Sequence, residues 1–142
     1  MKKLFVIIVI FGSAYSTSLY AQSKTPAIVL SSFRSSFNNA ENVSWSSVKD
    51  LYRVDFTLDE QNISAFFDED GNLIASSRNV TLQQIPMSLK SDLKKNYPDH
   101  EVAGLFEVDK EDGITYYATI RNSKNQLSLE STPAGDWIVT KK

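Results

Sequence analysis

Cysteine is absent from this sequence, and histidine occurs once, at position 100. Without cysteine the chain forms no disulfide, has no thiol nucleophile and no cysteine-ligated metal, and cannot be anchored through a lipidated cysteine. A single histidine also excludes a metal site built from several imidazoles. Low-complexity stretches and linkers are missing too, so we expect one domain held together by its hydrophobic core alone.

Long apolar runs are missing apart from one near the start. Lys2 and Lys3 precede an apolar run at 4–11, and small or polar residues follow up to Ala21. The run is shorter than the about 20 residues that a helix needs to cross a bilayer, and the order of the zones is typical of a secretory signal peptide. We therefore predict a signal peptide at 1–21, cleavage between Ala21 and Gln22, and a periplasmic or secreted protein without a membrane segment in its mature form.

Cleavage would leave 13 basic residues (15 less Lys2 and Lys3) against 17 acidic residues, a net charge of −4. A negative field repels phosphate backbones, so nucleic acid is not an expected partner. Residues 22–142 are numerous enough to bury one core.

Hydrophobic periodicity predicts an α+β fold with two helices and eight antiparallel strands. Helical spacing of apolar residues runs from Thr25-Pro26 to about 38, with Pro26 expected at the first helical position, and from Ile85-Pro86, which starts the second helix, to 97. Alternating segments follow each helix and are separated by polar or glycine turns. The strands are expected from 43 to an interruption at 49–50, and at 52–58, 63–67, 73–78, 101–108, 114–122, 126–132 and 136–141.

The two halves of the chain resemble each other. Phe33 and Phe37 align with Leu93 and Tyr97 at an offset of 60 residues, and the strand that begins at Ile63 aligns with later residues at an offset of 64. Such offsets indicate duplicated supersecondary structure. We predict two tandem repeats, about 25–79 and 80–142, each a helix plus a four-stranded antiparallel sheet, which share one core in a single domain.

Strand alternation also assigns side chains to the two faces of the predicted sheet. The face toward the helices is expected to carry Tyr52, Val54, Phe56, Ile63, Ala65, Phe67, Tyr116, Ala118, Ile120, Leu127 and Leu129. The other face would carry the apolar residues Phe66, Ile74, Tyr117 and Ile138 among the charged residues Arg53, Arg78, Arg121 and Glu130.

Aromatic anchors ringed by charge suit a protein-binding surface. The candidate partner-binding residues are therefore Phe66, Tyr117, Ile74, Ile138, Arg53 and Arg121. An alternative is that Phe66 and Tyr117 are scattered exposed residues, or that they only pair across strands.

Other candidate sites have ordinary structural explanations. Asp68-Glu-Asp-Gly71 could suggest calcium, but the twelfth position of an EF-hand loop would be Asn79 instead of glutamate, so a hairpin turn is expected. His100 lies between a helix and a strand, where a solvated loop residue is expected.

Three acidic residues on predicted strands, Asp55, Glu107 and Glu130, could in principle act as a glycosidase pair. We expect them on the wet face without a deep cleft, and therefore predict no catalytic residue, no metal and no cofactor.

The order of several short motifs resembles that of the exported PepSY-like proteins of Bacteroidetes, whose fold is like that of the beta-lactamase inhibitor protein. The motifs are Ala40-Glu-Asn-Val43-Ser-Trp45, Tyr52-Arg-Val54-Asp-Phe56, Ala65-Phe-Phe67-Asp68 with Gly71-Asn-Leu73, Ile85-Pro86, Tyr97-Pro98, and Asp112-Gly113 before Tyr116-Tyr117. The chain departs from the family at Asn38, where proline is common, and at Gln61-Asn62, where glycine is common. The resemblance implies two helix-plus-sheet repeats whose sheets join into a curved surface, which in the inhibitor grips an enzyme.

We therefore predict an exported, non-enzymatic protein-binding module, an inhibitor or accessory of another exported protein. A small-ligand or calcium-binding periplasmic protein and a weak hydrolase that uses strand carboxylates are the alternatives. The identity of the partner and the oligomeric state stay open at this stage.

Overall fold

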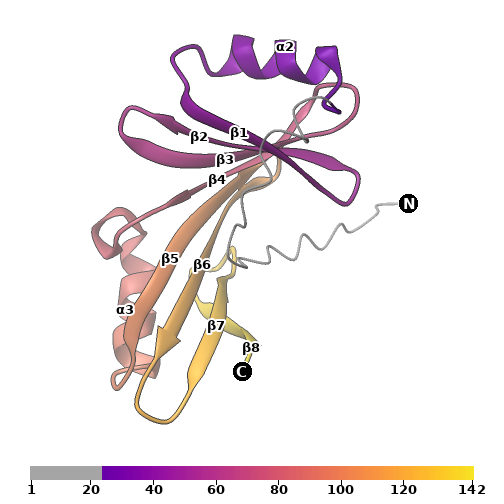
Figure 1. Ribbon diagram of the computed structural model, residues 1–142. Coiled ribbons are helices and arrows are strands. Elements are labelled where there is room, and N and C mark those ends of the chain that lie inside the picture. Colours follow the sequence, from indigo (N-terminus) through magenta and orange to yellow (C-terminus); the bar gives the residue numbers. More distant parts are fainter. Residues whose placement is uncertain (1–23) are drawn as a thin grey trace.

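The computed structural model describes residues 24–142 as two helices packed on one continuous antiparallel sheet (Figure 1). The predicted signal peptide and its cleavage site at Ala21 lie outside the described residues. Within 24–142, no helix is long and apolar enough to span a membrane.

Eight strands pair in chain order from β1 to β8, each antiparallel to the next. The elements are α2 (Ala27–Ser36), β1 (Glu41–Val48), β2 (Leu51–Leu58), β3 (Gln61–Phe67), β4 (Leu73–Asn79), the 3₁₀ helix η1 (Leu82–Gln84), α3 (Met87–Asn96), β5 (Glu101–Lys110), β6 (Gly113–Arg121), β7 (Gln126–Ser131) and β8 (Trp137–Lys141). Figure 1 shows the strands turning from nearly horizontal in β1–β3 to steep in β5–β7, so the sheet is strongly twisted. The predicted number, order and antiparallel pairing of the elements are confirmed.

The two helices begin and end in the same way. Pro26 and Pro86 are the residues just before the first helical residue, which for Pro26 is one position earlier than predicted, and each has a backbone φ compatible with the helix that follows. At the other end, the N–H of Phe37 donates to the carbonyl of Phe33 at 2.9 Å, and the N–H of Tyr97 donates to Leu93 at 2.9 Å. Each helix therefore closes on an aromatic residue whose ring packs back onto its core.

Each helix covers its own hydrophobic core. The α2 core consists of Val29, Phe33, Trp45, Val54, Phe56, Ala65 and Phe67, and the α3 core of Val80, Ile85, Leu89, Leu93, Leu105, Ala118, Ile120, Leu129 and Trp137. All eleven strand residues predicted to face the helices lie in these cores or pack against them. On the helix side the two halves do not share one core, because these two cores are separate clusters.

Between these cores the sheet buries its other side. Ile63, which faces α2, lies opposite Arg78 on β4, and Arg78 lies opposite Glu107 on β5. These three residues are therefore on the same face of the sheet, and the helix face is polar where β4 pairs with β5. The opposite face, called the open face below, carries buried Ala75 and Val108 in the same strands. A third cluster forms there, the open-face cluster, made of Phe66, Ala75 and Val108 with Val48, Leu51, Phe106 and Tyr117 packed against it.

An ion pair occupies the helix face opposite this cluster. Arg78 on β4 donates from Nε to Glu107 on β5 at 2.5 Å, and from its guanidinium to the amide oxygen of Gln61 at 3.1 Å. The Glu107 side chain is only 13% exposed, so its charge depends on Arg78 for compensation. Arg78 and Glu107 were both expected on the face away from the helices, and both predictions were wrong. Arg78 lies on the helix face because it pairs with Ile63, which packs on the α2 core. Glu107 lies there because β5 changes parity at a β-bulge between Val102 and Gly104.

Two turns that contain glycine pack closely against the helices. In the β3–β4 turn the Gly71 N–H donates to Asp68, and in the β7–β8 turn the Gly135 N–H donates to Thr132. Both glycines have positive φ, 82° and 90°. A side chain at Gly71 would meet the Ser32 hydroxyl of α2, and one at Gly135 would meet the Ser88 hydroxyl of α3, each at 2.6 Å.

Replacing Arg78 by methionine should lower the free energy of unfolding by about 2 kcal/mol, because the largely buried Glu107 carboxylate loses its partner. Chemical denaturation at neutral pH measures the change. Arg121→Met is the matched control, since Arg121 and Glu101 also pair across adjacent strands at 2.7 Å but are 58% and 68% exposed. The control should lose less than about 1 kcal/mol. Equal losses in the two variants would contradict the structural role assigned to Arg78.

Gly71→Ala and Gly135→Ala should each lower the free energy of unfolding by about 1–2 kcal/mol, because alanine disfavours positive φ and its Cβ crowds a helix. Gly104→Ala is the control, since its φ is not positive and the nearest atom to a new Cβ would be 3.9 Å away. Thermal or denaturant melts compare the three variants. A loss at Gly104 as large as at the two turns would show that the helix contacts are not responsible.

Candidate functional site

The open-face cluster presents one flat aromatic surface. Phe106 on β5 lies opposite Tyr117 on β6, and their rings stack with centroids 5.2 Å apart and an interplanar angle of 15°. Both side chains are half-buried. Their burial comes from Val108 and Phe66 beside them, so the pair is fixed in place while part of it stays accessible.

Phe66 lies on the predicted face of the sheet but is buried there. It is only 5% exposed and belongs to the open-face cluster. The prediction that Phe66 is an exposed anchor was therefore wrong. The physical reason is that β4 and β5, where they pair, carry polar side chains on the helix face and the apolar residues Ala75 and Val108 on the open face. Ala75 and Val108 pack with Phe66 there and form a small core.

Arg53 covers Phe66 and is held by a polar network. Its guanidinium carbon lies 5.8 Å from the centroid of the Phe66 ring, a cation–π arrangement. Arg53 donates from Nε to the Asp55 carboxylate at 3.0 Å and from its terminal nitrogen to the Ser64 hydroxyl at 3.3 Å, and that hydroxyl donates to the same carboxylate. The network fixes the guanidinium and balances its charge locally.

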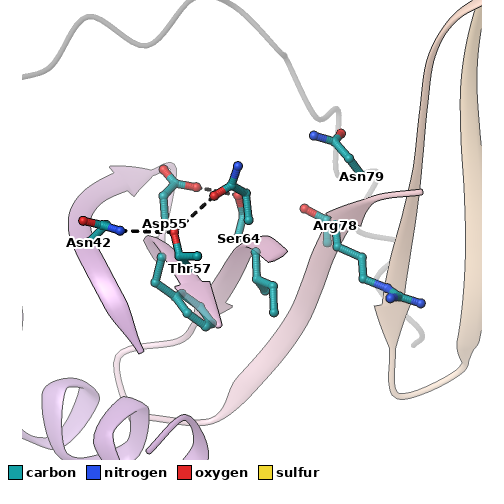
Figure 2. Close-up of a pocket in the computed structure, with 10 residues that line it drawn as sticks. Asn42, Asp55, Thr57, Ser64, Arg78 and Asn79 are labelled. Carbon is teal, nitrogen blue, oxygen red and sulfur yellow. Dashed lines mark hydrogen bonds between the residues drawn. The ribbon is translucent and has the colours of Figure 1, made fainter. Parts of the chain in front are cut away.

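A polar pocket of ≈ 250 Å³ opens beside this network (Figure 2). The Asn42 amide donates to the Thr57 hydroxyl at 3.5 Å, and Thr57 donates to the amide oxygen of Asn62 at 3.2 Å. Figure 2 shows the Arg78 side chain leading away from Asn42, Thr57 and Asp55. Amides and hydroxyls therefore dominate the lining, which suits hydrogen bonding to a neutral polar group.

Tyr117 also has a charged neighbour. Burial raises the pKa of the Tyr117 phenol, and the carboxylate of Glu130, its cross-strand partner and hydrogen-bond acceptor, raises this pKa further. The hydroxyl therefore stays protonated at neutral pH and remains a hydrogen-bond donor.

The remaining candidate residues do not join this group. Ile74 is the unpaired residue of a β-bulge, since Phe66 lies opposite Ala75 and Phe67 opposite Leu73. Ile74 was predicted on the face opposite the helices, and it is not among the residues that form the open-face cluster or pack against it. Arg121 pairs with Glu101 at the far end of β6, and Ile138 is exposed on the edge strand β8. The structure thus brings together Arg53, Phe66 and Tyr117.

Sequence reasoning missed Phe106, Val108 and the bond between Ser64 and Asp55. Phe106-Glu-Val108 does alternate, and this signal could have placed both apolar residues on one face of β5. The face they share was hidden by the bulge near Gly104.

The three strand carboxylates do not converge. Asp55 on β2 and Glu130 on β7 are five strands apart, about 24 Å at the usual strand spacing, and Glu107 is on the other face. A glycosidase pair requires carboxyl groups within about 10 Å of each other.

The acidic turn and the histidine are engaged locally. The Asp68 carboxylate accepts from the side-chain amide of Asn72 at 2.9 Å and from two backbone N–H groups, which lowers its pKa. His100 Nε2 lies 3.0 Å from the Asn125 amide oxygen. Across the described part of the chain, no three histidine or acidic side chains are grouped as metal ligands.

Comparison with known proteins places the fold. No family model matches the sequence, and no curated protein matches it significantly. A DUF2874 family protein from Bacteroides uniformis is 18% identical with a TM-score of 0.73, covering 80% of this chain and 86% of its own. A proposed periplasmic protein from Bacteroides eggerthii is 16% identical with a TM-score of 0.74, covering 82% and 90%. A BLIP-like protein from Bacteroides fragilis is 14% identical with a TM-score of 0.69, covering 82% and 87%. These similarities show that the chain has the BLIP-like fold.

Proposed function

We propose that this protein is an exported, non-enzymatic binding module that holds a partner protein against its open face. The observation that carries the proposal is the stacked Phe106–Tyr117 pair, which is half-buried and packs against the cluster whose Phe66 ring lies under the hydrogen-bonded guanidinium of Arg53. Aromatic and arginine side chains that are already ordered lose little entropy on binding, and they dominate the energetics of protein interfaces.

The surroundings of the aromatic pair favour a protein over a small molecule. Charged groups flank it on two sides, Arg53 with Asp55 on β2 and Glu130 on β7, which gives an apolar centre with a polar rim. The surface spans several strands of a rigid sheet instead of forming a deep cleft. Phe66 contributes from below, by supporting Arg53 and Tyr117, and is not itself a contact residue.

A small-ligand function is a second candidate, supported by the polar pocket beside Asn42, Thr57 and Asn62. A hexose-sized or amide-bearing group suits its volume and its lining. The calcium alternative has less support, because the Asp68 oxygens are engaged by donors of their own turn.

Export is part of the proposal. Support comes from the zones of residues 1–21 and from the B. eggerthii protein of the same fold, which is described as periplasmic. Membership of the PepSY-like group remains a prediction from the motifs.

We also infer that the two halves are tandem repeats. The helices differ by 60 positions at both ends, and the closing hydrogen bonds at Phe37 and Tyr97 keep this offset. The turn bonds at Gly71 and Gly135 differ by 64 positions, and each glycine packs on the helix of its own half. Arg53–Phe66 and Tyr117–Glu130 are cross-strand pairs at equivalent positions, and each pair contributes one half of the proposed binding surface, with Phe66 as the support beneath Arg53.

Photo-crosslinking tests the surface. A photo-crosslinking phenylalanine derivative in place of Thr119, which is half-buried on the open face next to Tyr117, should capture a specific exported protein in the producing cell. The same derivative in place of exposed Lys95 on α3 is the control and should not capture it. Mass spectrometry identifies the product.

With the captured partner purified, Tyr117→Ala should weaken binding by at least about tenfold, because truncation of a central aromatic residue typically costs more than about 1.4 kcal/mol. Lys95→Ala should leave the affinity unchanged, and circular dichroism should show that both variants are folded. Crosslinks from Lys95 alone, or full affinity in the folded Tyr117→Ala variant, would refute the assigned surface.

A further inference from the structure

A second hollow lies on the helix face, far from the open-face cluster. It has a volume of ≈ 830 Å³ and lies between η1, α3 and the start of β5. The pairing of β4 with β5 ends at Asn79 and Phe106, so the first residues of β5 extend beyond β4. This overhang forms one wall of the hollow, which we call the α3 groove.

The α3 groove is apolar at its floor. Leu93, Tyr97 and Ile120 line it from α3 and β6. Their counterparts in the first half are Phe33, Phe37 and Phe56, whose rings fill the equivalent space with centroid separations of 5.7, 5.1 and 4.7 Å. Smaller aliphatic side chains replace two of the three rings in the second half.

The large aromatic residue of the second half does not fill this space. Trp137 is held elsewhere, by its ring N–H to the Leu89 carbonyl at 3.0 Å and its backbone N–H to the Asp92 carboxylate at 2.9 Å. Because Leu93 and Ile120 are smaller than Phe33 and Phe56 at the equivalent positions, room is left along the C-terminal half of α3.

Cationic groups line one side of the groove. Met87, Lys90 and Lys94 follow one another along the same side of α3, and Met87 is 73% exposed. Lys90 donates one ammonium proton to the Gln83 carbonyl at 3.2 Å, which leaves two donors. Lys94 forms no ion pair within residues 24–142. Glu101, the acidic residue of the lining, is already paired with Arg121.

His100 closes the end of the groove. Its Nε2 bonds to Asn125, while its Nδ1 is buried and has no hydrogen-bond partner among the described residues.

We propose that the α3 groove binds a free fatty acid, with its alkyl chain along Leu93, Tyr97 and Ile120 and its carboxylate beside Lys90 and Lys94. An alkyl chain matches the apolar floor, and two ammonium groups along one side match a single anionic head. The volume is within the usual range for small-molecule sites, about 300–1,000 Å³. The site is independent of the protein-binding surface, which lies on the other face of the sheet.

Titration of the uniformly ¹⁵N-labelled protein with decanoate tests the proposal. Saturable amide shifts should be confined to η1, α3 and the first residues of β5. The Lys90→Gln/Lys94→Gln double variant should bind between about fivefold and about thirtyfold more weakly, because it loses two partly exposed charge pairs. Val102→Trp, which places a ring in the groove, should abolish the shifts.

Arg34→Gln is the matched control, since Arg34 is the α2 residue equivalent to Lys94, and it should bind decanoate like the wild type. Decyl glucoside has the same chain length with an uncharged head and should bind more weakly than decanoate. The proposal is overturned if decanoate gives no saturable shifts, if the double lysine variant binds equally well, or if the glucoside binds as tightly. An acidic, leucine-rich peptide that binds where decanoate does not would assign the groove to a protein partner instead.

Discussion

The pairing of β4 with β5 is the constraint on which the rest of this structure depends. Each helix can bury its own apolar stripe on four strands, but only this ladder, from Ala75–Lys110 to Asn79–Phe106, makes one sheet of the two halves. In the other strands most buried apolar side chains face the helices, whereas in this ladder they lie on the open face. The helix face carries the Arg78–Glu107 ion pair, while the other face carries Ala75 and Val108. The gap between the two helices is thus closed by a salt bridge on one side and by an apolar cluster on the other, so no helix is needed to cover the junction.

This reversal decides which side chains are available for recognition. Because Ala75 and Val108 surround Phe66, that ring becomes part of a small core and serves as a platform for the Arg53 guanidinium. The partly exposed aromatic side chains are instead Phe106 and Tyr117, two and three strands away from Phe66. Arg53, Asp55 and Ser64 are ordered by their own hydrogen bonds before any partner arrives. A surface of this kind is stiff, since its position depends on strand pairing instead of on loops.

Sequence reasoning predicted those features that depend on local periodicity. The two helices, the order of eight strands and the eleven strand residues that face the helices follow from spacing, because a long amphipathic pattern has one stable orientation. It failed at Arg78 and at Glu107, which lie on the helix face. In Ile74-Ala-Ser-Ser-Arg78 one alternating set combines Ile74 with Ser76 and Arg78, and the other is Ala75 with Ser77, so the pattern does not say which set is buried. In β5 the bulge near Gly104 exchanges the faces partway along the strand. Neither a bulge nor the burial of Phe66 has a signal in a single sequence, since both depend on which strand lies beside which.

The candidate sites lie where the two proposed repeats differ. At equivalent positions, the first half pairs Arg53 with Phe66 and the second pairs Tyr117 with Glu130. The charged residue is on the first strand of the pair in the first half and on the second strand in the second half. The rings thereby meet at the centre of the open face, and the charges lie outside them. On the helix face, the first half packs Phe33 against Phe37 and Phe56, whereas the second half has Leu93 and Ile120 at the matching positions and leaves a groove. Two copies of one helix-plus-sheet unit can share a fold because the pattern of buried positions is kept. The two halves can nevertheless have different surfaces. Replacing an aromatic side chain by an aliphatic or charged one at these positions changes which groups are exposed, but it does not change the strand pairing.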